Sequence, residues 1–251
     1  GLQFKYHLDD DVSVTMPMFK GSWLDSDSGA VMQEVAINGQ TPVELLQQGP
    51  DRKESTSLRS LYRNGFKTED NKESKGDTPT FRATITKGDE KVAESQRAKG
   101  WLNVSDGKRG VGVGIKNFLK EYPKGIEMDP TTKTLVGSIW PKNNGPMSFA
   151  RHNTEPDGEM LDNFAQGITK TTEFIYYFHN SEEADSVGQK MDYVLDAPVA
   201  HASPEWYTGS KVYGNMAPFS TQYPEFENAM QYKFEWWAYN QKHEPWYGMF
   251  D

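Results

Sequence analysis

Residues 100–128 read GWLNVSDGKRGVGVGIKNFLKEYPKGIEM, and this stretch decides the fold class. Its Ser105-Asp106-Gly107 turn stands between two strand-like runs, which predicts a β-hairpin. In the second run, glycines alternate with Val111, Val113 and Ile115. Glycine inside a strand removes packing, so the pattern indicates a bulge or the close approach of a ligand or another segment. We favour tight packing of a second sheet.

Further strand-like runs lie on both sides of this stretch. Residues 12–46 predict several strands, with Asn38-Gly39 forming a tight hairpin between two of them. Residues 79–87 alternate polar and apolar side chains, and residues 87–90 form a turn. A long buried strand is expected to end at His179. The polar segment 49–76 is interpreted as a long connection with one strand.

Two helices are predicted near the C-terminus. The segment SEEADSVGQKMDYVL, residues 181–195, has a capping serine, acidic residues in its first turn and spaced apolar residues. A second helix is predicted to start at Pro224, with Phe226, Met230, Phe234 and Trp237 on one face. Residues 196–222 are interpreted as loop.

Composition favours a mainly β protein. The chain has 251 residues, 35% of them hydrophobic, which is enough for one large core. Its 7 Trp, 12 Tyr and 13 Phe suit strands better than a helical bundle. We therefore expect a large antiparallel β-sandwich with a few short helices over residues 1–200, followed by a loop and a helix over residues 201–251.

Charge and residue usage narrow the class of partner. The net charge of -9 argues against binding to nucleic acid, and an acidic polysaccharide would need a local cluster of Lys and Arg. The chain has no cysteine, and none of its apolar runs is long enough to span a membrane. No metal or other cofactor is predicted. The one metal considered is calcium at Asp9-Asp10-Asp11, but these consecutive residues lack the ligand spacing of a dedicated calcium-binding loop.

The motifs resemble those of the YetA-like and exo-rhamnogalacturonan-lyase-like family. The resemblance rests on GW, VSDG, the VGVGIKNF strand, EYPK, the SIWP block, GITKTTEFIYYFH and the final WYGMFD. It implies a supersandwich of the galactose-mutarotase type, followed in the family by an α/α-toroid that would lie beyond residue 251. It also implies a polysaccharide lyase acting on rhamnogalacturonan or ulvan-type polymers.

The candidate catalytic residues are Arg151, His152 and Tyr247. Eliminating a uronate needs a group that stabilises the carboxylate, a base near the C5 proton and an acid at the leaving oxygen. Arg151 and His152 offer suitable chemistry, but neighbours on a strand point to opposite faces, so both enter one cleft only at a bulge or loop. A surface role for His152 and a packing role for Tyr247 are the alternatives.

The candidate sugar-binding residues are His201, Trp206, Tyr207 and Trp246. Aromatic rings stack on the apolar faces of pyranoses, although Trp206 and Tyr207 suit interdomain packing equally well. A carboxylate pair for glycoside hydrolysis could come from the segment 155–162, which we interpret instead as a solvated turn.

Two functions are therefore expected. The first is a module of a polysaccharide lyase that cleaves uronate-containing polysaccharide by β-elimination, with the fragment inactive alone. The alternative is a non-catalytic carbohydrate-binding module for an acidic glycan. Either implies a secreted, periplasmic or cell-surface protein that takes part in polysaccharide degradation or recognition.

Overall fold

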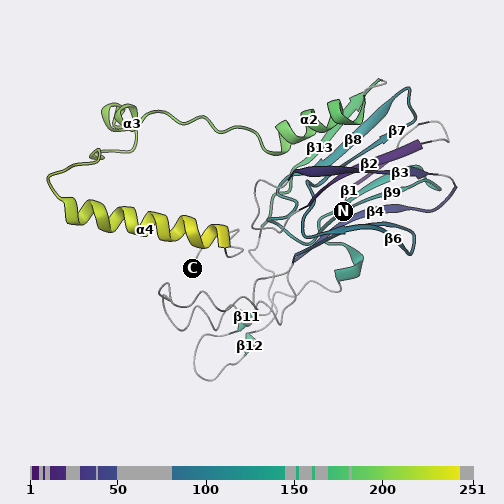
Figure 1. The fold of residues 1–251 in the computed structure, drawn as a ribbon, viewed down its shortest axis with the longest axis horizontal. Helices are drawn as coiled ribbons and strands as arrows, with labels where there is room; N and C mark the ends of the chain where they lie inside the picture. Colours follow the sequence, from purple (N-terminus) through teal and green to yellow (C-terminus); the bar gives the residue numbers. More distant parts are fainter. Residues whose placement is uncertain are drawn as a thin grey trace. The chain divides into compact units, whose positions relative to one another are not determined.

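The chain forms a β-sandwich followed by a helical segment (Figure 1). The structure is a computed structural model that describes residues 2–5, 8, 12–20, 29–37, 39–49, 81–144, 151–152, 160–161, 169–180 and 183–243. The chain divides into two compact units, Gly1–Asp196 and Ala197–Asp251. The sequence placed this boundary between residues 200 and 201.

The first unit contains two main antiparallel sheets. The six-stranded sheet has the order β1-β10-β9-β4-β5-β6. Its strands are β1 (Leu2–Lys5), β10 (Thr134–Ser138), β9 (Lys124–Asp129), β4 (Val43–Gln48), β5 (Arg82–Lys87) and β6 (Glu90–Ser95). The five-stranded sheet has the order β13-β8-β7-β2-β3. Its strands are β13 (Phe174–His179), β8 (Gly110–Ile115), β7 (Trp101–Ser105), β2 (Val12–Phe19) and β3 (Ala30–Ile37). The predicted mainly β sandwich is confirmed.

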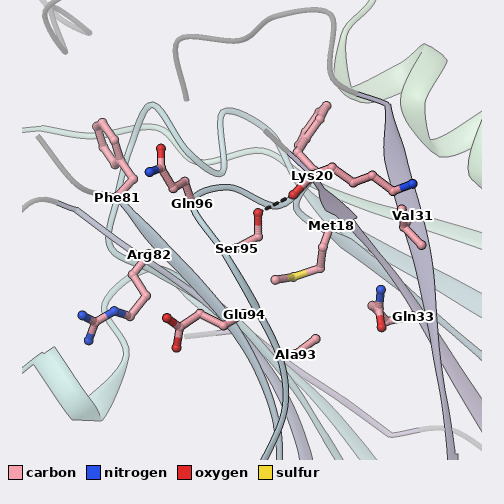
Figure 2. A pocket seen from close by; sticks show the side chains of 11 residues that line it. Met18, Lys20, Val31, Gln33, Phe81, Arg82, Ala93, Glu94, Ser95 and Gln96 are labelled. Carbon is pink, nitrogen blue, oxygen red and sulfur yellow. Dashed lines mark hydrogen bonds between the residues drawn. The ribbon is translucent and has the colours of Figure 1, made fainter. Parts of the chain in front are cut away.

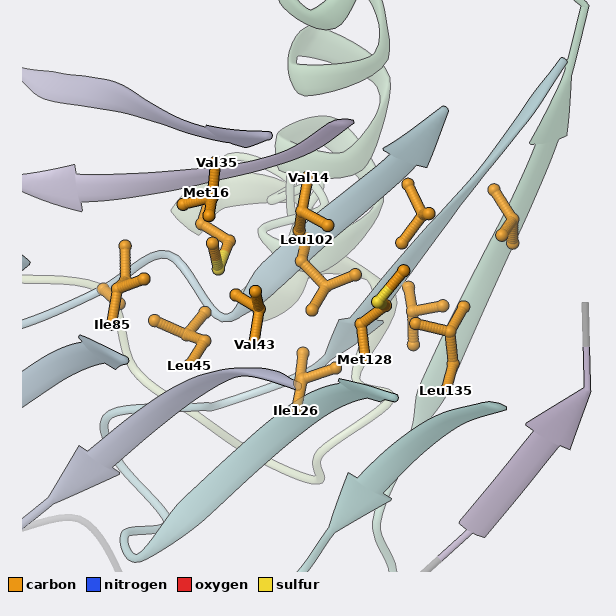
Figure 3. Close-up of a cluster of buried hydrophobic side chains, with 14 of the residues drawn as sticks. Val14, Met16, Val35, Val43, Leu45, Ile85, Leu102, Ile126, Met128 and Leu135 are labelled. Atoms are coloured by element: carbon orange, nitrogen blue, oxygen red, sulfur yellow. The ribbon is translucent and has the colours of Figure 1, made fainter. Parts of the chain in front are cut away.

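The core lies between these two sheets, where alternate residues of each strand point inward (Figure 3). The five-stranded sheet contributes residues such as Val14, Met16 and Leu102, and the six-stranded sheet contributes Leu45 and Ile126. All five are fully buried. Burial of each aliphatic side chain of this size contributes about 1.5–3 kcal/mol, so this interface is the main source of stability.

The SDG hairpin is confirmed, whereas the Asn38-Gly39 hairpin is wrong. Strands β7 and β8 pair directly, with Ser105 opposite Gly110. Strands β3 and β4, by contrast, belong to different sheets, so the chain passes from one layer to the other after β3. Asn38 itself lies outside the described residues. A pair of turn residues in the sequence cannot show whether the following strand pairs with the preceding strand or joins the other sheet.

Helix α2 (Ala184–Leu195) explains the glycines of β8, and our interpretation of sheet-on-sheet packing was wrong. The helix covers the outer face of the five-stranded sheet (Figure 1). A Cβ atom at Gly112 would lie 3.2 Å from Met191 Sδ, and one at Gly114 would lie 2.8 Å from Met191 Cε. The glycines therefore make room for a helix on the face opposite the core.

The α2 helix itself was predicted, but its cap and its neighbour strand differ from expectation. Its N-cap residue is Glu183, which makes no side-chain capping bond, while Ser181 lies outside the described residues. Strand β13 is an edge strand of six residues and not a long buried strand, and its Phe178 is 63% exposed.

Short elements complete the first unit. Residues Lys142–Asn144 form a 3₁₀ helix, η2. Strands β11 (Arg151–His152) and β12 (Met160–Leu161) make a separate two-stranded ladder. The predicted strand within residues 49–76 falls in a segment of which only Gly49 is described.

The second unit contains helices α3 (Pro204–Ser210) and α4 (Pro224–His243). The predicted start of α4 at Pro224 is confirmed. Helix α3 was missed in a segment interpreted as loop. Its start follows an ordinary capping rule, because the Ser203 side chain accepts a hydrogen bond from the backbone N–H of Trp206 at 3.2 Å, and Pro204 occupies the first turn.

Candidate functional site

A pocket of about 650 Å³ opens between β3 and β6, the edge strands of the two main sheets (Figure 2). Its walls combine apolar, amide and charged side chains. The lining residues are Met18, Phe19, Lys20, Val31, Gln33, Phe81, Arg82, Ala93, Glu94, Ser95 and Gln96. None of them was among the site residues predicted from sequence.

The path of the chain builds one wall of this pocket. After β6 the backbone leaves the six-stranded sheet and crosses to β7 in the five-stranded sheet. The crossing segment is held to the end of β2, because the Phe19 N–H donates to the Arg97 carbonyl at 3.2 Å and the Lys99 N–H donates to the Pro17 carbonyl at 3.3 Å. The Ser95 hydroxyl also donates to the Phe19 carbonyl. The pocket therefore lies where the two sheets are tied together.

Gln47 fixes the crossing segment from inside the core. Its side chain is fully buried, and its Nε2 donates to the carbonyls of Arg82 and Gln96 at 3.2 and 3.1 Å. Its Oε1 accepts from the backbone N–H of Ala98 at 3.1 Å. A buried amide of this kind is stable only when its polar atoms are paired, and here they pair with backbone groups of the segments that line the pocket.

Polar residues in the pocket stand at positions where the core pattern would place apolar ones. On β3, Val35 and Ile37 face the core. Gln33 stands two residues before Val35, so it lies on the same side of the strand. On β6, Ser95 stands two residues after Ala93, which packs against the core. Both Gln33 and Ser95 line the pocket between β3 and β6. A polar residue in such an alternating run was the signal that the sequence offered for this site.

Charged side chains form the rim of the pocket. Lys20 and Arg82 are cations and Glu94 is a carboxylate; Figure 2 shows Arg82 and Glu94 side by side, with the Lys20 side chain pointing away from both toward β3. Lys91 donates to Glu94 Oε2 at 2.7 Å. This hydrogen bond, the charge of Lys91 and the nearby Arg82 hold the pKa of Glu94 below its usual value. Glu94 is therefore an acceptor at neutral pH and a weak base.

Two further cations, Arg97 and Lys99, lie beside the ring of Phe19, which lines the pocket. The Arg97 guanidinium stacks over the Phe19 ring at 4.0 Å from the ring centre, and Lys99 lies 5.8 Å from the same centre. Lys99 also pairs with Asp192 of α2, which accepts a hydrogen bond from Trp101 Nε1 at 3.0 Å. These contacts connect the pocket wall to the helix on the outer face of the sheet.

The predicted catalytic residues are not brought into this pocket by the described structure. Arg151 and His152 are successive residues of β11, opposite Leu161 and Met160, and only their backbone is described. Successive strand positions are the arrangement that we considered unfavourable for a shared cleft. Tyr247 lies outside the described residues, so its predicted role stays a prediction.

The predicted sugar-binding residues His201, Trp206 and Tyr207 belong to the second unit. The rings of Trp206 and Tyr207 are 5.5 Å apart and nearly perpendicular, and Tyr213 lies 5.9 Å from Tyr207. Perpendicular rings cannot both stack on one flat sugar chain. His201 is exposed in the loop before α3, and Trp246 lies outside the described residues.

Other titratable groups serve the fold. Buried His179 Nε2 lies 2.9 Å from Asn103 Oδ1 on the outer face of the five-stranded sheet. Lys124 is fully buried and lies 3.6 Å from Glu121 Oε2, which Lys170 approaches to 3.3 Å. Burial lowers the pKa of Lys124, and the charge of Lys170 lowers it further. Within the described residues, no group of three or more His, Asp or Glu side chains is arranged to hold a metal ion.

Comparison with known proteins yields no assignment. No model of a protein family and no curated protein matches the sequence. Among the described helices, none is long and apolar enough to cross a membrane.

Proposed function

We propose that this chain is a carbohydrate-binding β-sandwich that holds an acidic polysaccharide in the pocket between β3 and β6. The observation that carries the proposal is that two cationic residues, Lys20 and Arg82, are among those that line a pocket in a chain of net charge -9. An anionic polymer is repelled by such a chain at long range, so its binding needs local positive charge at the site.

The remaining lining suits a sugar. The Gln33 and Gln96 amides can both donate to and accept from hydroxyl groups, while Met18, Val31 and Ala93 offer apolar contact. Arg82 has the planar, forked donor geometry that matches a carboxylate. The ligand that fits these groups together is a sugar with a carboxylate and free hydroxyls. Such polymers occur outside cells, which agrees with the predicted secreted, periplasmic or cell-surface location.

The lyase hypothesis takes second place. The described lining of the pocket contains no histidine or tyrosine, and the lowered pKa of Glu94 makes it a poor base for removing a sugar C–H proton. β-Elimination stays a prediction that rests on Arg151, His152 and Tyr247. Release of the unsaturated uronate, followed by its ultraviolet absorbance, tests it directly.

Calorimetric titration with oligogalacturonates tests the binding proposal. Arg82→Gln is expected to weaken binding by about tenfold, since a hydrogen bond between charged groups contributes about 1.5–3 kcal/mol. Lys20→Gln should weaken it in the same direction. Arg109→Gln, which removes one positive charge from the β7–β8 turn, is the matched control and should change affinity little. Absence of binding across uronate polymers, or equal affinity in all three variants and the wild type, would overturn the proposal.

A further inference from the structure

β3 is the longest edge strand of the sandwich. It has eight residues, against four in β1 and six each in β6 and β13, and within the described residues it pairs with β2 alone. An edge strand presents a row of unpaired backbone N–H and C=O groups, to which a further strand can bind. β3 also forms one side of the pocket, through Val31 and Gln33 (Figure 2).

The pairing of β2 shows which backbone groups of β3 are free. The N–H of Lys99, next to β7, donates to the Pro17 carbonyl at 3.3 Å, so the odd-numbered residues of β2 direct their backbone groups toward β7. The even-numbered residues of β2 therefore bond to β3, and their partners there are odd-numbered, as Met18 with Val31. It follows that the even-numbered residues of β3 direct their N–H and C=O groups to the free edge.

Met32 and Glu34 are two such residues in the middle of the strand. No described residue forms a hydrogen bond with their outward N–H and C=O groups. At the far end of the strand, the outward carbonyl of Ala36 accepts a hydrogen bond from Lys87 Nζ at 2.9 Å. This contact agrees with the direction derived from β2, and the part of β3 beside the pocket has no such contact among the described residues.

β6, the edge strand on the other side of the pocket, is built to discourage strand addition, and β3 is not. β6 carries Glu90, Lys91 and Glu94, and its register with β5 is irregular. Charged side chains and bulges are the means by which proteins prevent pairing at an edge. β3 keeps a regular register with β2 and has one charged residue, Glu34. β3 is therefore the side of the pocket at which a strand can be added.

We propose that β3 binds an extended peptide of another protein as an additional antiparallel strand, with small apolar side chains at alternate positions and basic side chains between them. The orientation follows the two main sheets, in which every described pair is antiparallel. The apolar positions lie opposite Val31 and Gln33, so their side chains enter the pocket beside Met18 and Ala93. The inference does not rest on the proposed function.

Charge selects a basic peptide over a second copy of this chain. The positions between the apolar ones lie opposite Met32 and Glu34, and their side chains share the face on which Glu34 is exposed. A lysine or arginine at such a position pairs with the Glu34 carboxylate across the two strands. The net charge of -9 also attracts a basic peptide at long range and repels another copy of the chain.

The test titrates the full chain into a fluorescein-labelled peptide that alternates lysine and valine over seven residues, with binding followed by fluorescence anisotropy. In the added strand the lysine N–H groups donate to β3 and the valine N–H groups point away from it. N-methylation of the two central lysine amides should therefore weaken binding by about tenfold or more, because it removes backbone hydrogen bonds. N-methylation of two valine amides preserves those bonds and the charge of the peptide, so it is the matched control and should change affinity little.

Two variants of Glu34 separate the contribution of the backbone from that of the charge. Glu34→Gln should weaken binding by about threefold, as for one exposed ion pair. Glu34→Pro also removes the outward N–H, so it should weaken binding by about tenfold or more. That N–H makes no hydrogen bond among the described residues, and proline is tolerated at such an edge position, so the variant should fold, as circular dichroism checks.

The outcomes decide between the possible occupants of the edge. Absence of saturable binding, or equal affinity for the parent and the lysine-methylated peptide, would overturn the inference. Dimerisation of the wild type that Glu34→Pro abolishes, detected by light scattering, would assign the edge to a second copy and overturn it as well. The comparison of methylated peptides decides the question even where Glu34→Pro does not fold.

Discussion

The side-chain oxygen of Gln47 accepts a hydrogen bond from the backbone N–H of Ala98 at 3.1 Å and thereby ties the six-stranded sheet to the segment that crosses to its partner sheet. The same side chain donates to the carbonyls of Arg82 and Gln96, which line the pocket. One buried amide thus holds three backbone positions at the candidate site.

Replacing Gln47 should destabilise the sandwich. Gln47→Met keeps the volume but leaves buried carbonyl and N–H groups without partners, so we expect the free energy of unfolding to fall by about 3 kcal/mol. Urea denaturation measures the loss. Gln48→Met, which removes a single partly buried hydrogen bond to Asn144 at 3.2 Å, is the control and should cost about 1 kcal/mol. Equal losses in the two variants would contradict the role assigned to Gln47.

The glycines of β8 should differ in their tolerance of a methyl group. At Gly110 an added Cβ would lie 2.7 Å from the Val104 carbonyl oxygen, which is backbone and cannot move freely. At Gly112 the nearest atom is the flexible Met191 Sδ at 3.2 Å. We therefore expect Gly110→Ala to cost about 3 kcal/mol and Gly112→Ala about 1 kcal/mol, measured by thermal unfolding. Gly29→Ala, with open space around the added atom, is the control. A larger loss in Gly112→Ala than in Gly110→Ala would contradict this ranking of the two contacts.

Glu44 should make stability depend on pH. It stands opposite Glu127 on the neighbouring strand, and burial, followed by the charge of Glu127, raises its pKa above the ordinary 4.5. A raised pKa means that folding favours the protonated carboxyl. The associated stability is present below pH 4.5 and is lost as pH rises through the folded pKa.

Glu44→Gln should therefore stabilise the protein at pH 7 and have little effect at acidic pH. Urea denaturation at both pH values checks the sign. Glu34→Gln, which removes one carboxylate at an exposed position of β3, serves as the control. A Glu44→Gln variant that is less stable than wild type at pH 7 would contradict the account.

Lys124 should be dispensable for stability. Its ammonium is buried 3.6 Å from Glu121, but Glu121 also has Lys170 at 3.3 Å and a hydrogen bond from Asn117 at 3.2 Å. Lys124→Met removes a buried charge without leaving Glu121 unpaired, so we expect a gain of about 1 kcal/mol at pH 7.

The advantage of Lys124→Met should shrink as pH rises, because the lowered pKa lets the wild-type lysine lose its proton within the fold. Chemical denaturation at several pH values follows the difference. Lys116→Met, which breaks an exposed pair with Glu173, is the control and should change stability by less than about 1 kcal/mol. A large loss of stability in Lys124→Met would show that the buried ion pair is needed.

The sequence could predict the layers of this fold better than their connections. Local patterns identified the β7–β8 hairpin and helices α2 and α4, because turns, caps and periodicity act over a few residues. The pairing of β3 and β4 with different sheets depends on contacts between residues far apart in the sequence. The role of the β8 glycines also depends on a distant residue, because Met191, which packs over Gly112 and Gly114, lies about 80 residues later in the chain.

The candidate pocket was harder to predict for the same reason. Its residues come from the ends of β2, β3, β5 and β6, and each segment is unremarkable alone. Sequence reasoning turned instead to unusual local runs, Arg151-His152 and the Trp206-Tyr207 pair. Gln33 and Gln47 were detectable as polar residues in apolar alternation. Gln47 contacts the crossing segment at Gln96 and Ala98, and Gln33 lines the pocket, and neither relation can be read from the local sequence.

The most direct test of the central claim is to locate a bound oligogalacturonate by chemical-shift mapping of the isotopically labelled protein. The account predicts that the largest shifts occur at Lys20, Gln33, Arg82, Glu94 and Gln96, around the pocket between β3 and β6. Saturable binding with shifts confined to the aromatic residues 206–213 of the second unit, and none at the pocket, would contradict it.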